Sequence, residues 1–215
     1  MKTATRALHA GLGVILAASG LAAAASAASD SRPSPVRIRV ERRPGGVFEV
    51  SARLSVPAST AAAWSVITDY ANIPSFVSSM KSSRVVGRDG GALIVEQTAV
   101  GRMFLFSREM RVTLTVRRAG DRLTFDDRGR EDFEIYNGSW RVVAAPGGCE
   151  VRYRLLARPD VPAPRFLLGG AMKRGARRLL EQVRNEILRR ELARATDTSA
   201  PASLRRHRPT PALLE

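Results

Sequence analysis

The sequence predicts an α+β fold in which one curved antiparallel sheet holds one long C-terminal helix. Two observations support this prediction. From Pro162 to Leu192 the apolar residues recur at the spacing of one face of a helix. From Ser83 to Arg158 apolar and polar residues alternate, and the turns between the alternating segments are short, which favours antiparallel strands.

The predicted helix begins near Pro164 and continues to about Leu192. Pro164 suits the first helical position, because the N–H that proline lacks would be unpaired there anyway. The helix would be roughly 40 Å long at about 1.5 Å per residue, so it needs a large apolar surface to lie on. Its apolar stripe consists of Leu168, Met172, Ala176, Leu179, Val183 and Ile187, with Leu180 and Leu188 beside them.

Two strands and a helical pair precede the main run of strands. Residues 36–43 and 48–56 alternate apolar and polar positions on either side of a Pro-Gly-Gly turn. Ser59 or Thr60 then caps a short helix, and Pro74 lies near the start of a second helical turn. The remaining predicted strands span residues 83–87, 92–100, 103–117, 122–126, 133–144 and 149–158.

The first residues have the features of a secretory signal peptide. In residues 1–27, Lys2 and Arg6 precede an uncharged apolar run, which ends in small residues that suit cleavage after Ala27. The run is short for a membrane span, which needs about 20 apolar residues. The sequence therefore predicts a periplasmic or secreted protein.

One folded domain is expected between two less ordered segments. Residues 28–35 are a Ser/Pro linker, and the predicted domain occupies residues 36–194. Residues 195–215 are rich in Thr, Ser, Ala and Pro and carry a short basic cluster, which is typical of a disordered tail. A length of 215 residues with 44% hydrophobic content fits one domain with tails.

The chain carries 35 basic and 20 acidic residues, which gives a net charge of +15. This balance favours anionic partners, and the basic residues of the last helix and the tail suggest contact with an anionic membrane surface. Arginine is otherwise spread over most predicted strands, without the localised stripe and stacking aromatics of nucleic-acid binders. No nucleic-acid partner is therefore expected.

The predicted domain lacks the residues of several common catalytic and metal sites. The two histidines, His9 and His207, lie in the signal peptide and the tail, which excludes Ser-His-acid and Cys-His catalysis. A single cysteine, Cys149, cannot make an internal disulfide or a zinc site, and it is expected to be buried at a strand start. Gly169 and Gly170 do not form a phosphate loop. No cofactor or metal is therefore expected.

The inward faces of the strands and the last helix supply candidates for a ligand pocket. These faces are large, apolar and aromatic, which fits either a packed core or a cavity between sheet and helix. The predicted pocket-lining residues are Phe106, Arg108, Met110, Phe125, Glu134, Tyr136, Trp140, Tyr153, Leu168, Met172 and Leu179.

Two charged residues share the inward face by alternation. A buried charge is costly unless it is paired or hydrated, so Arg108 and Glu134 fit a cavity mouth or an internal ion pair. The alternative is a β-bulge, or a place near a strand end, that turns Arg108 outward.

A cluster of carboxylates falls between two predicted strands. Asp126, Asp127, Glu131 and Asp132 surround Gly129, and we interpret them as a solvated turn. Glu134 is then the one fair candidate for an acid–base carboxylate inside a cavity.

Three stretches resemble the START-like, polyketide cyclase/dehydrase (SRPBCC) superfamily. The first is the helical pair from Trp64 to Phe76, which contains Asp69-Tyr70 and Pro74. The others are Asn137-Gly138-Ser139-Trp140-Arg141-Val142 with Val151-Arg-Tyr153-Arg-Leu155, and Ala163-Pro164-Arg-Phe166 before the long helix. The resemblance covers roughly Phe48 to Leu192 and is nearest the coenzyme Q-binding and polyketide cyclase-like members.

The resemblance implies a helix-grip fold, in which a curved antiparallel sheet wraps around the C-terminal helix and two short helices lie between early strands. It also implies an elongated hydrophobic pocket for a lipid, a quinone or a polyketide-like ligand. The family has no universal catalytic motif, so the resemblance transfers no catalytic residue. Export is unusual beside cytoplasmic or organellar members, and the strand at residues 36–43 is an addition.

Three functions follow as hypotheses. The leading one is a non-enzymatic binding or carrier protein for a hydrophobic small molecule or lipid. The second is a polyketide cyclase or dehydratase, in which Glu134, Tyr136 and Arg108 would supply acid–base and oxyanion groups. The third is a membrane-surface adaptor that uses the basic helix face and the tail on anionic lipid, with binding that salt would weaken.

Overall fold

The computed structural model describes residues 36–103, 106–161 and 165–199, all within one compact unit. The predicted signal peptide, the linker and most of the predicted tail lie outside these residues. The cleavage site after Ala27 and the disorder of the terminal segment therefore stay predictions.

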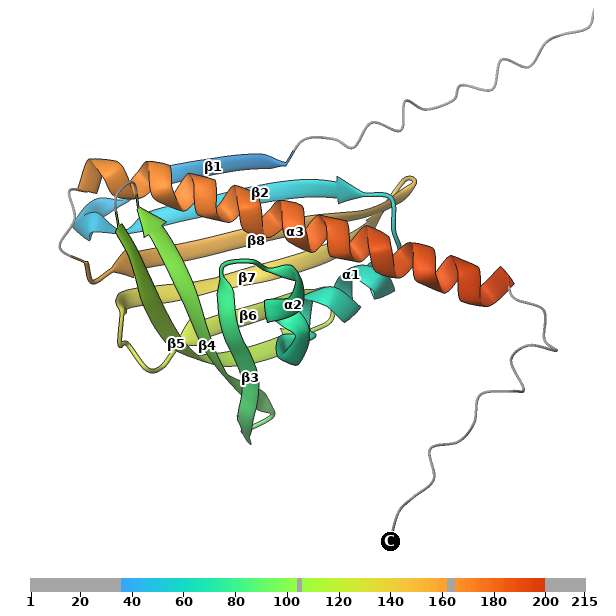
Figure 1. Ribbon diagram of the computed structural model, residues 1–215, viewed down its shortest axis with the longest axis horizontal. Coiled ribbons are helices and arrows are strands. Elements are labelled where there is room, and N and C mark those ends of the chain that lie inside the picture. Colours follow the sequence, from blue (N-terminus) through green and yellow to red (C-terminus); the bar gives the residue numbers. More distant parts are fainter. Residues whose placement is uncertain (1–35, 104–105, 162–164, 200–215) are drawn as a thin grey trace, which may run out of the picture. The chain divides into compact units, whose positions relative to one another are not determined.

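In the described part of the chain, eight strands form one antiparallel sheet in the order β1-β2-β8-β7-β6-β5-β4-β3. Strands β3 to β8 are sequential neighbours, whereas β8 returns to pair with β2. The open, curved sheet confirms the predicted fold class (Figure 1). The strands are β1 (Arg37–Arg42), β2 (Phe48–Val56), β3 (Met80–Asp89), β4 (Ala92–Met103), β5 (Phe106–Ala119), β6 (Arg122–Asp127), β7 (Phe133–Ala145) and β8 (Gly148–Pro159).

Helices occur between β2 and β3 and after β8. The first group is α1 (Thr60–Ile67), the 3-10 turn η2 (Tyr70–Asn72) and α2 (Ile73–Phe76), while the 3-10 turn η1 (Pro44–Gly46) joins β1 to β2. The helix α3 (Arg165–Ser199) crosses one face of the sheet, with α1 and α2 beside it (Figure 1). Because α3 continues to Ser199, the first residues of the predicted tail are helical.

Ser59 is the residue that caps α1. Its Oγ accepts a hydrogen bond from the backbone N–H of Ala62 at 3.2 Å, which satisfies a donor that the first turn leaves free. Glu191 of α3 in turn accepts bonds from the Ser59 backbone N–H at 3.0 Å and from its Oγ at 2.8 Å. The start of α1 is thereby tied to the far part of α3.

The core lies between α3 and the sheet face that it covers. On α3, Leu180 and Ile187 have no exposed surface, and Ala176 and Val183 are also buried, as the stripe predicts. Burying a large aliphatic side chain contributes about 1.5–3 kcal/mol. No helix in the described part of the chain combines the length and apolar character that a membrane span requires.

The carboxylates around Gly129 are not a solvated turn throughout, so that interpretation is wrong for two of them. Asp127 and Asp132 are buried, and they accept hydrogen bonds from the backbone N–H groups of Thr113 (2.9 Å) and Arg111 (2.8 Å) on β5. Strand β6 ends at Asp127, so these carboxylates take the place of its missing carbonyl groups beside β5. Their role is to complete the sheet.

Candidate functional site

A cavity of about 110 Å³ lies between the sheet, the α1–α2 segment and α3. It receives side chains from α1, η2, α2, strands β3 to β8 and α3. Its aromatic and polar lining residues are Tyr70, Phe76, Gln97, Phe125, Tyr136, Trp140 and Tyr153. The rest are aliphatic residues and one methionine: Val66, Ile67, Ile73, Val77, Met80, Leu114, Val116, Leu123, Leu179 and Val183.

One wall of the cavity is an aromatic cluster on β6, β7 and β8. Ring centroids are 4.5 Å apart between Trp140 and Tyr153, and 5.9 Å apart between Phe125 and Tyr136. Phe133 adds a contact of 4.6 Å to Tyr136. These tilted arrangements are favourable for aromatic pairs, so the rings stabilise one another in this wall.

Two phenol groups of this wall interact with each other. Burial raises the pKa of Tyr136 to about 12, and burial also raises the pKa of Tyr153 well above its ordinary value. Their mutual hydrogen bond lowers the pKa of Tyr136 and raises that of Tyr153, as expected if Tyr153 donates to the Tyr136 oxygen. Both phenols therefore stay protonated near neutral pH.

Tyr70, on the opposite side, has a hydroxyl without a partner. Its Oη is buried and forms no hydrogen bond among the described residues. Burial raises the pKa of Tyr70 to about 12, although the positive charge of Arg118 opposes the shift. A buried hydroxyl without a partner is costly, and Tyr70 is one of the residues that line the cavity.

The structure brings some of the predicted pocket residues together around the cavity and places others elsewhere. Those that border the cavity are Phe125, Tyr136, Trp140, Tyr153 and Leu179. Met110 and Met172 pack against the core, and Leu168 is buried, but none of the three lines the cavity. The side chain of Phe106 lies outside the described part of the structure.

Arg108 and Glu134 do not line the cavity, which corrects the inward placement that their alternation suggested. Arg108 lies near the start of β5, where it is exposed and contacts Asp132 Oδ1 through Nη2 at 2.6 Å. Its pairing with Gly101 is regular, so a position near the strand end, rather than a bulge, explains its exposure. Glu134 is exposed and forms an ion pair with Arg158.

A β-bulge in β7 explains why the side chain of Glu134 is exposed. The register between β7 and β8 shifts between Phe133 and Ile135, which breaks the alternation of inward and outward side chains. Phe133 and Tyr136 therefore both face inward, and Glu134 turns out. An internal pair between Arg108 and Glu134 does not form.

The α1–α2 segment was missing from the predicted site, yet it supplies a whole wall. Val66, Ile67, Tyr70, Ile73 and Phe76 line the cavity. The signal in the sequence was the helical spacing of these apolar residues, which shows a buried face but not which surface it covers.

Two groups of contacts hold this segment against α3. Gln182 donates to Ser78 Oγ at 2.9 Å and accepts from the Ser78 N–H at 3.3 Å. Arg190 donates to Asp69 Oδ2 and to the Ser65 carbonyl, both at 2.7 Å, and it also contacts Glu186. Both ends of the cavity wall are therefore tied to one helix.

The site offers little for acid–base or metal chemistry. Tyrosines are the titratable residues among the described side chains that line the cavity. His, Cys, Asp and Glu side chains of the described residues nowhere form a group of three that could hold a metal ion. Cys149 is buried, and burial together with Glu191 raises the pKa of its thiol, so it stays protonated.

Comparisons with solved structures show the same fold in proteins of low sequence identity. A protein of Thermus thermophilus has a TM-score of 0.58 with 22% identity, and the match covers 65% of this chain and 97% of that one. The STAR-related lipid transfer protein of Xanthomonas axonopodis (fragment 25–204) has a TM-score of 0.56 with 16% identity, covering 72% and 94%. The Zhui aromatase/cyclase of a Streptomyces species has a TM-score of 0.56 with 12% identity, covering 67% and 95%.

Sequence comparison identifies the family. No curated protein matches the sequence. The family model described as "Polyketide cyclase / dehydrase and lipid transport" matches residues 47–193, which is well over half of the chain and includes every element that lines the cavity. Family and fold both fit a domain that binds a hydrophobic ligand. The chain belongs to the polyketide cyclase/dehydrase and lipid transport family.

Proposed function

We propose that this protein is an exported binding or carrier protein for an uncharged hydrophobic molecule, which it holds in the cavity between the sheet and α3. The observation that supports this most directly is the lining. Among the described residues that line the cavity there is no Lys, Arg, Asp or Glu, and the polar groups are three tyrosines, Gln97 and the Trp140 indole. A charged ligand would lose its hydration without gaining a partner.

The same lining favours a ligand that carries an acceptor oxygen. The free hydroxyl of Tyr70 can donate to a carbonyl, ester or hydroxyl oxygen, and that bond would remove the cost of an unpaired buried group. A quinone ring, a polyketide-like ring or the ester end of a lipid meets this requirement. The apolar walls would hold the remainder of the molecule.

The size of the cavity limits what enters it without a structural change. A dry cavity of about 150 Å³ is known to hold benzene, and this one measures about 110 Å³. A ring or a short piece of an acyl chain is therefore the portion that the cavity holds as it stands. A larger portion requires the lining residues to move apart.

A cyclase or dehydratase is the less favoured alternative. Of the three groups proposed for it, Arg108 and Glu134 lie outside the cavity, and Tyr136 has its pKa raised to about 12. A general base works best with a pKa near the working pH. The geometry thus favours binding over turnover.

A cavity-filling variant tests the binding function. Leu179→Trp places a larger side chain in the cavity, while Leu192→Trp changes an exposed residue of the same helix and serves as the control. Lipids and quinones that co-purify are extracted and identified by mass spectrometry, and their binding is then titrated. The proposal requires binding by the wild type and by Leu192→Trp, and loss of binding in Leu179→Trp. Equal binding by all three proteins would reject it.

Export is a separate part of the proposal, and it rests on the first residues of the chain. Lys2 and Arg6 followed by an uncharged apolar run and Ala25-Ser26-Ala27 support a cleavable signal peptide. The intact mass of the protein isolated from a periplasmic fraction or the medium checks the cut after Ala27. Full-length protein confined to the cytoplasm would reject export and leave the binding function untouched.

A further inference from the structure

The sheet face that points away from α3 carries a row of arginines across five neighbouring strands. Along the strands, the arginines alternate with buried inward residues such as Leu54, Leu123 and Tyr153. The arginine side chains therefore point outward. The row follows directly from the strand register, in which each residue is the partner of the next. Its members are Arg37 on β1, Arg53 on β2, Arg152 on β8, Arg141 on β7 and Arg122 on β6.

Such a row is unfavourable for folding alone, because like charges that face each other across strands are destabilising. Nearby acids neutralise part of it: Arg141 pairs with Asp121 at 2.7 Å, and Arg152 pairs with Glu150. No ion pair among the described residues involves Arg37, Arg53 or Arg122. The positive charge of the row is therefore only partly compensated.

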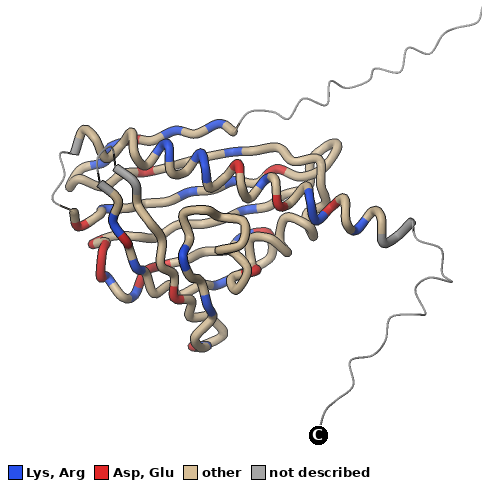
Figure 2. The backbone as a smooth tube through the Cα atoms, in the orientation of Figure 1, with Lys and Arg blue, Asp and Glu red and all other residues tan. Residues whose placement is uncertain are grey.

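The other end of the same sheet shows that the chain can pair its charges. On β3 and β4, Arg84 and Glu96 are register partners and bond at 2.6 Å, and Lys81 pairs with Glu109 of β5. Basic positions occur on the strands as well as on α3 (Figure 2). The partly compensated row is thus a local property of β1, β2, β8, β7 and β6 and not of the whole sheet.

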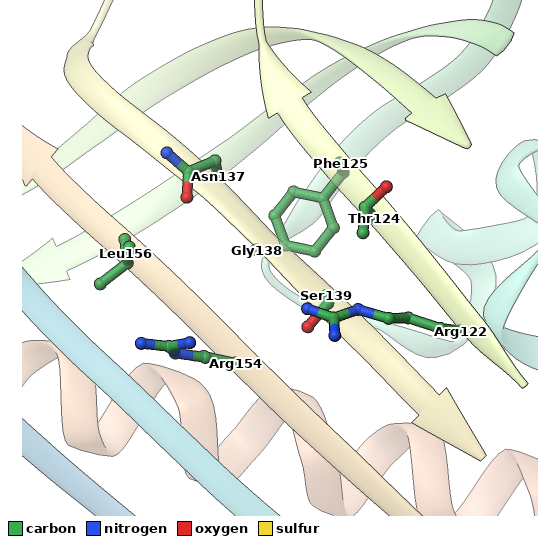
Figure 3. A pocket seen from close by; sticks show the side chains of 8 residues that line it. All are labelled: Arg122, Thr124, Phe125, Asn137, Gly138, Ser139, Arg154 and Leu156. Carbon is green, nitrogen blue, oxygen red and sulfur yellow. The ribbon is translucent and has the colours of Figure 1, made fainter. Parts of the chain in front are cut away.

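A hollow of about 250 Å³ lies beside this row, on the outer surface of β6, β7 and β8. Gly138 and the Phe125 ring form its floor, and α3 lies behind the strands in the view of Figure 3. Its remaining lining residues are Arg122, Thr124, Asn137, Ser139, Arg154 and Leu156. No carboxylate is among the described residues that line it.

The donors of the hollow suit a tetrahedral oxyanion. Arg122 extends across β7 beside Ser139, and Arg154 stands on the next strand (Figure 3). Arg154 uses its Nε for Glu49 at 2.8 Å, which leaves its terminal nitrogens for another acceptor. Two guanidinium groups with hydroxyl and amide donors between them provide the charge-assisted bonds that phosphate oxygens accept.

We propose that this outer hollow binds a phosphate group, either as free phosphate or as the headgroup of an acidic phospholipid. It is separate from the ligand cavity, since the two lie on opposite faces of the sheet. The arginine row surrounds the hollow with positive charge and draws the anion to it. If the phosphate belongs to a lipid, this face of the sheet rests on the membrane surface, and α3 lies on the side away from the membrane.

The test measures binding of inorganic phosphate by calorimetry and of vesicles by co-sedimentation. The vesicles contain phosphatidylcholine alone, phosphatidylcholine with phosphatidic acid, or phosphatidylcholine with the same charge supplied by oleate. Arg122→Gln with Arg154→Gln removes both guanidinium groups of the hollow, and Ser139→Ala removes a hydroxyl without changing charge. Arg88→Gln with Arg177→Gln removes equal charge from β3 and α3 and is the control.

The proposal predicts that the first double variant and Ser139→Ala weaken phosphate-dependent binding, the double variant by about tenfold or more, while the control stays within about twofold. Binding of free phosphate identifies a soluble ligand, and binding of phosphatidic acid vesicles alone identifies the membrane. Three results would overturn the proposal: no binding of either, equal binding to oleate vesicles, or equal loss in the control. Ligand binding in the cavity should be unchanged in every variant.

Discussion

The ring of Phe125 occupies the space that a side chain at position 138 would need. A Cβ added at Gly138 would stand 2.7 Å from Phe125 Cζ and 2.2 Å from the backbone oxygen of Arg154. Because glycine has no side chain, the Phe125 ring can lie against β7, border the inner cavity and form the floor of the outer hollow. One close approach therefore helps to shape both hollows.

Gly138→Ala should destabilise the protein by about 2–3 kcal/mol, because a backbone oxygen has little freedom to move away from the added methyl group. Urea unfolding measures the loss. Gly87→Ala is the control, since a Cβ at Gly87 meets nothing within 4 Å, and its stability should change by no more than about 0.5 kcal/mol. Equal stability of the two variants would contradict the close approach.

Removing the free hydroxyl from the cavity should separate stability from binding. Tyr70→Phe deletes a buried group that has no partner, so the free energy of unfolding should stay the same or rise by up to about 1 kcal/mol, while ligand affinity falls.

The matched change is Tyr153→Phe, which deletes a hydroxyl that bonds to Tyr136 and should cost about 1 kcal/mol. Two measurements distinguish the variants: thermal unfolding without ligand, and titration with a quinone or lipid that the wild type binds. A large stability loss in Tyr70→Phe would show that its hydroxyl has a partner.

The carboxylate of Asp132 should contribute strongly to stability. Asp132→Ala leaves the Arg111 N–H unpaired and removes the contact with Arg108, which should cost about 2–3 kcal/mol. Asp126→Ala, at an exposed position nearby, should change stability by less than about 0.5 kcal/mol. Chemical denaturation compares them, and similar losses in both would indicate that Asp132 acts only through net charge.

Acid should destabilise the fold through Glu186 of α3, which holds Arg190, the residue that contacts Asp69 and Ser65 of the cavity wall. Hydrogen bonds from Arg189, and then from Arg190, lower the pKa of Glu186 to about 2, although burial opposes them. The charged form stabilises the fold fully above the unfolded pKa of about 4.3. This contribution disappears as the pH falls toward 2, because the folded state must then also bind the proton.

Glu186→Gln should therefore be less stable than the wild type at pH 6 by about 1–2 kcal/mol, and the difference should vanish near pH 2. Urea unfolding of both proteins across this range gives the comparison. Taking the difference cancels the effect of other carboxyls with lowered pKa values, such as Glu49. A difference that does not depend on pH would mean that Glu186 acts through packing.

The sequence alone was sufficient for the strands, the long helix and the family. Local alternation sets which face of β2 or β8 is apolar, and the helical stripe through Val183 and Ile187 identifies the buried side of α3. These features depend on residues a few positions apart, so they can be read along the chain. The aromatic residues Phe125, Tyr136, Trp140 and Tyr153 were assigned to the interior for the same reason.

Only the tertiary structure decided which of these surfaces meet. A one-residue bulge turned Glu134 outward, the end of β6 buried Asp127 and Asp132, and the packing of α1 and α2 closed the cavity around Tyr70. The arginine row exists because strands far apart in sequence, such as β2 and β8, pair in one particular register. Strand register and the positions of bulges are set by contacts between segments that are distant in sequence. A local sequence pattern therefore does not predict them.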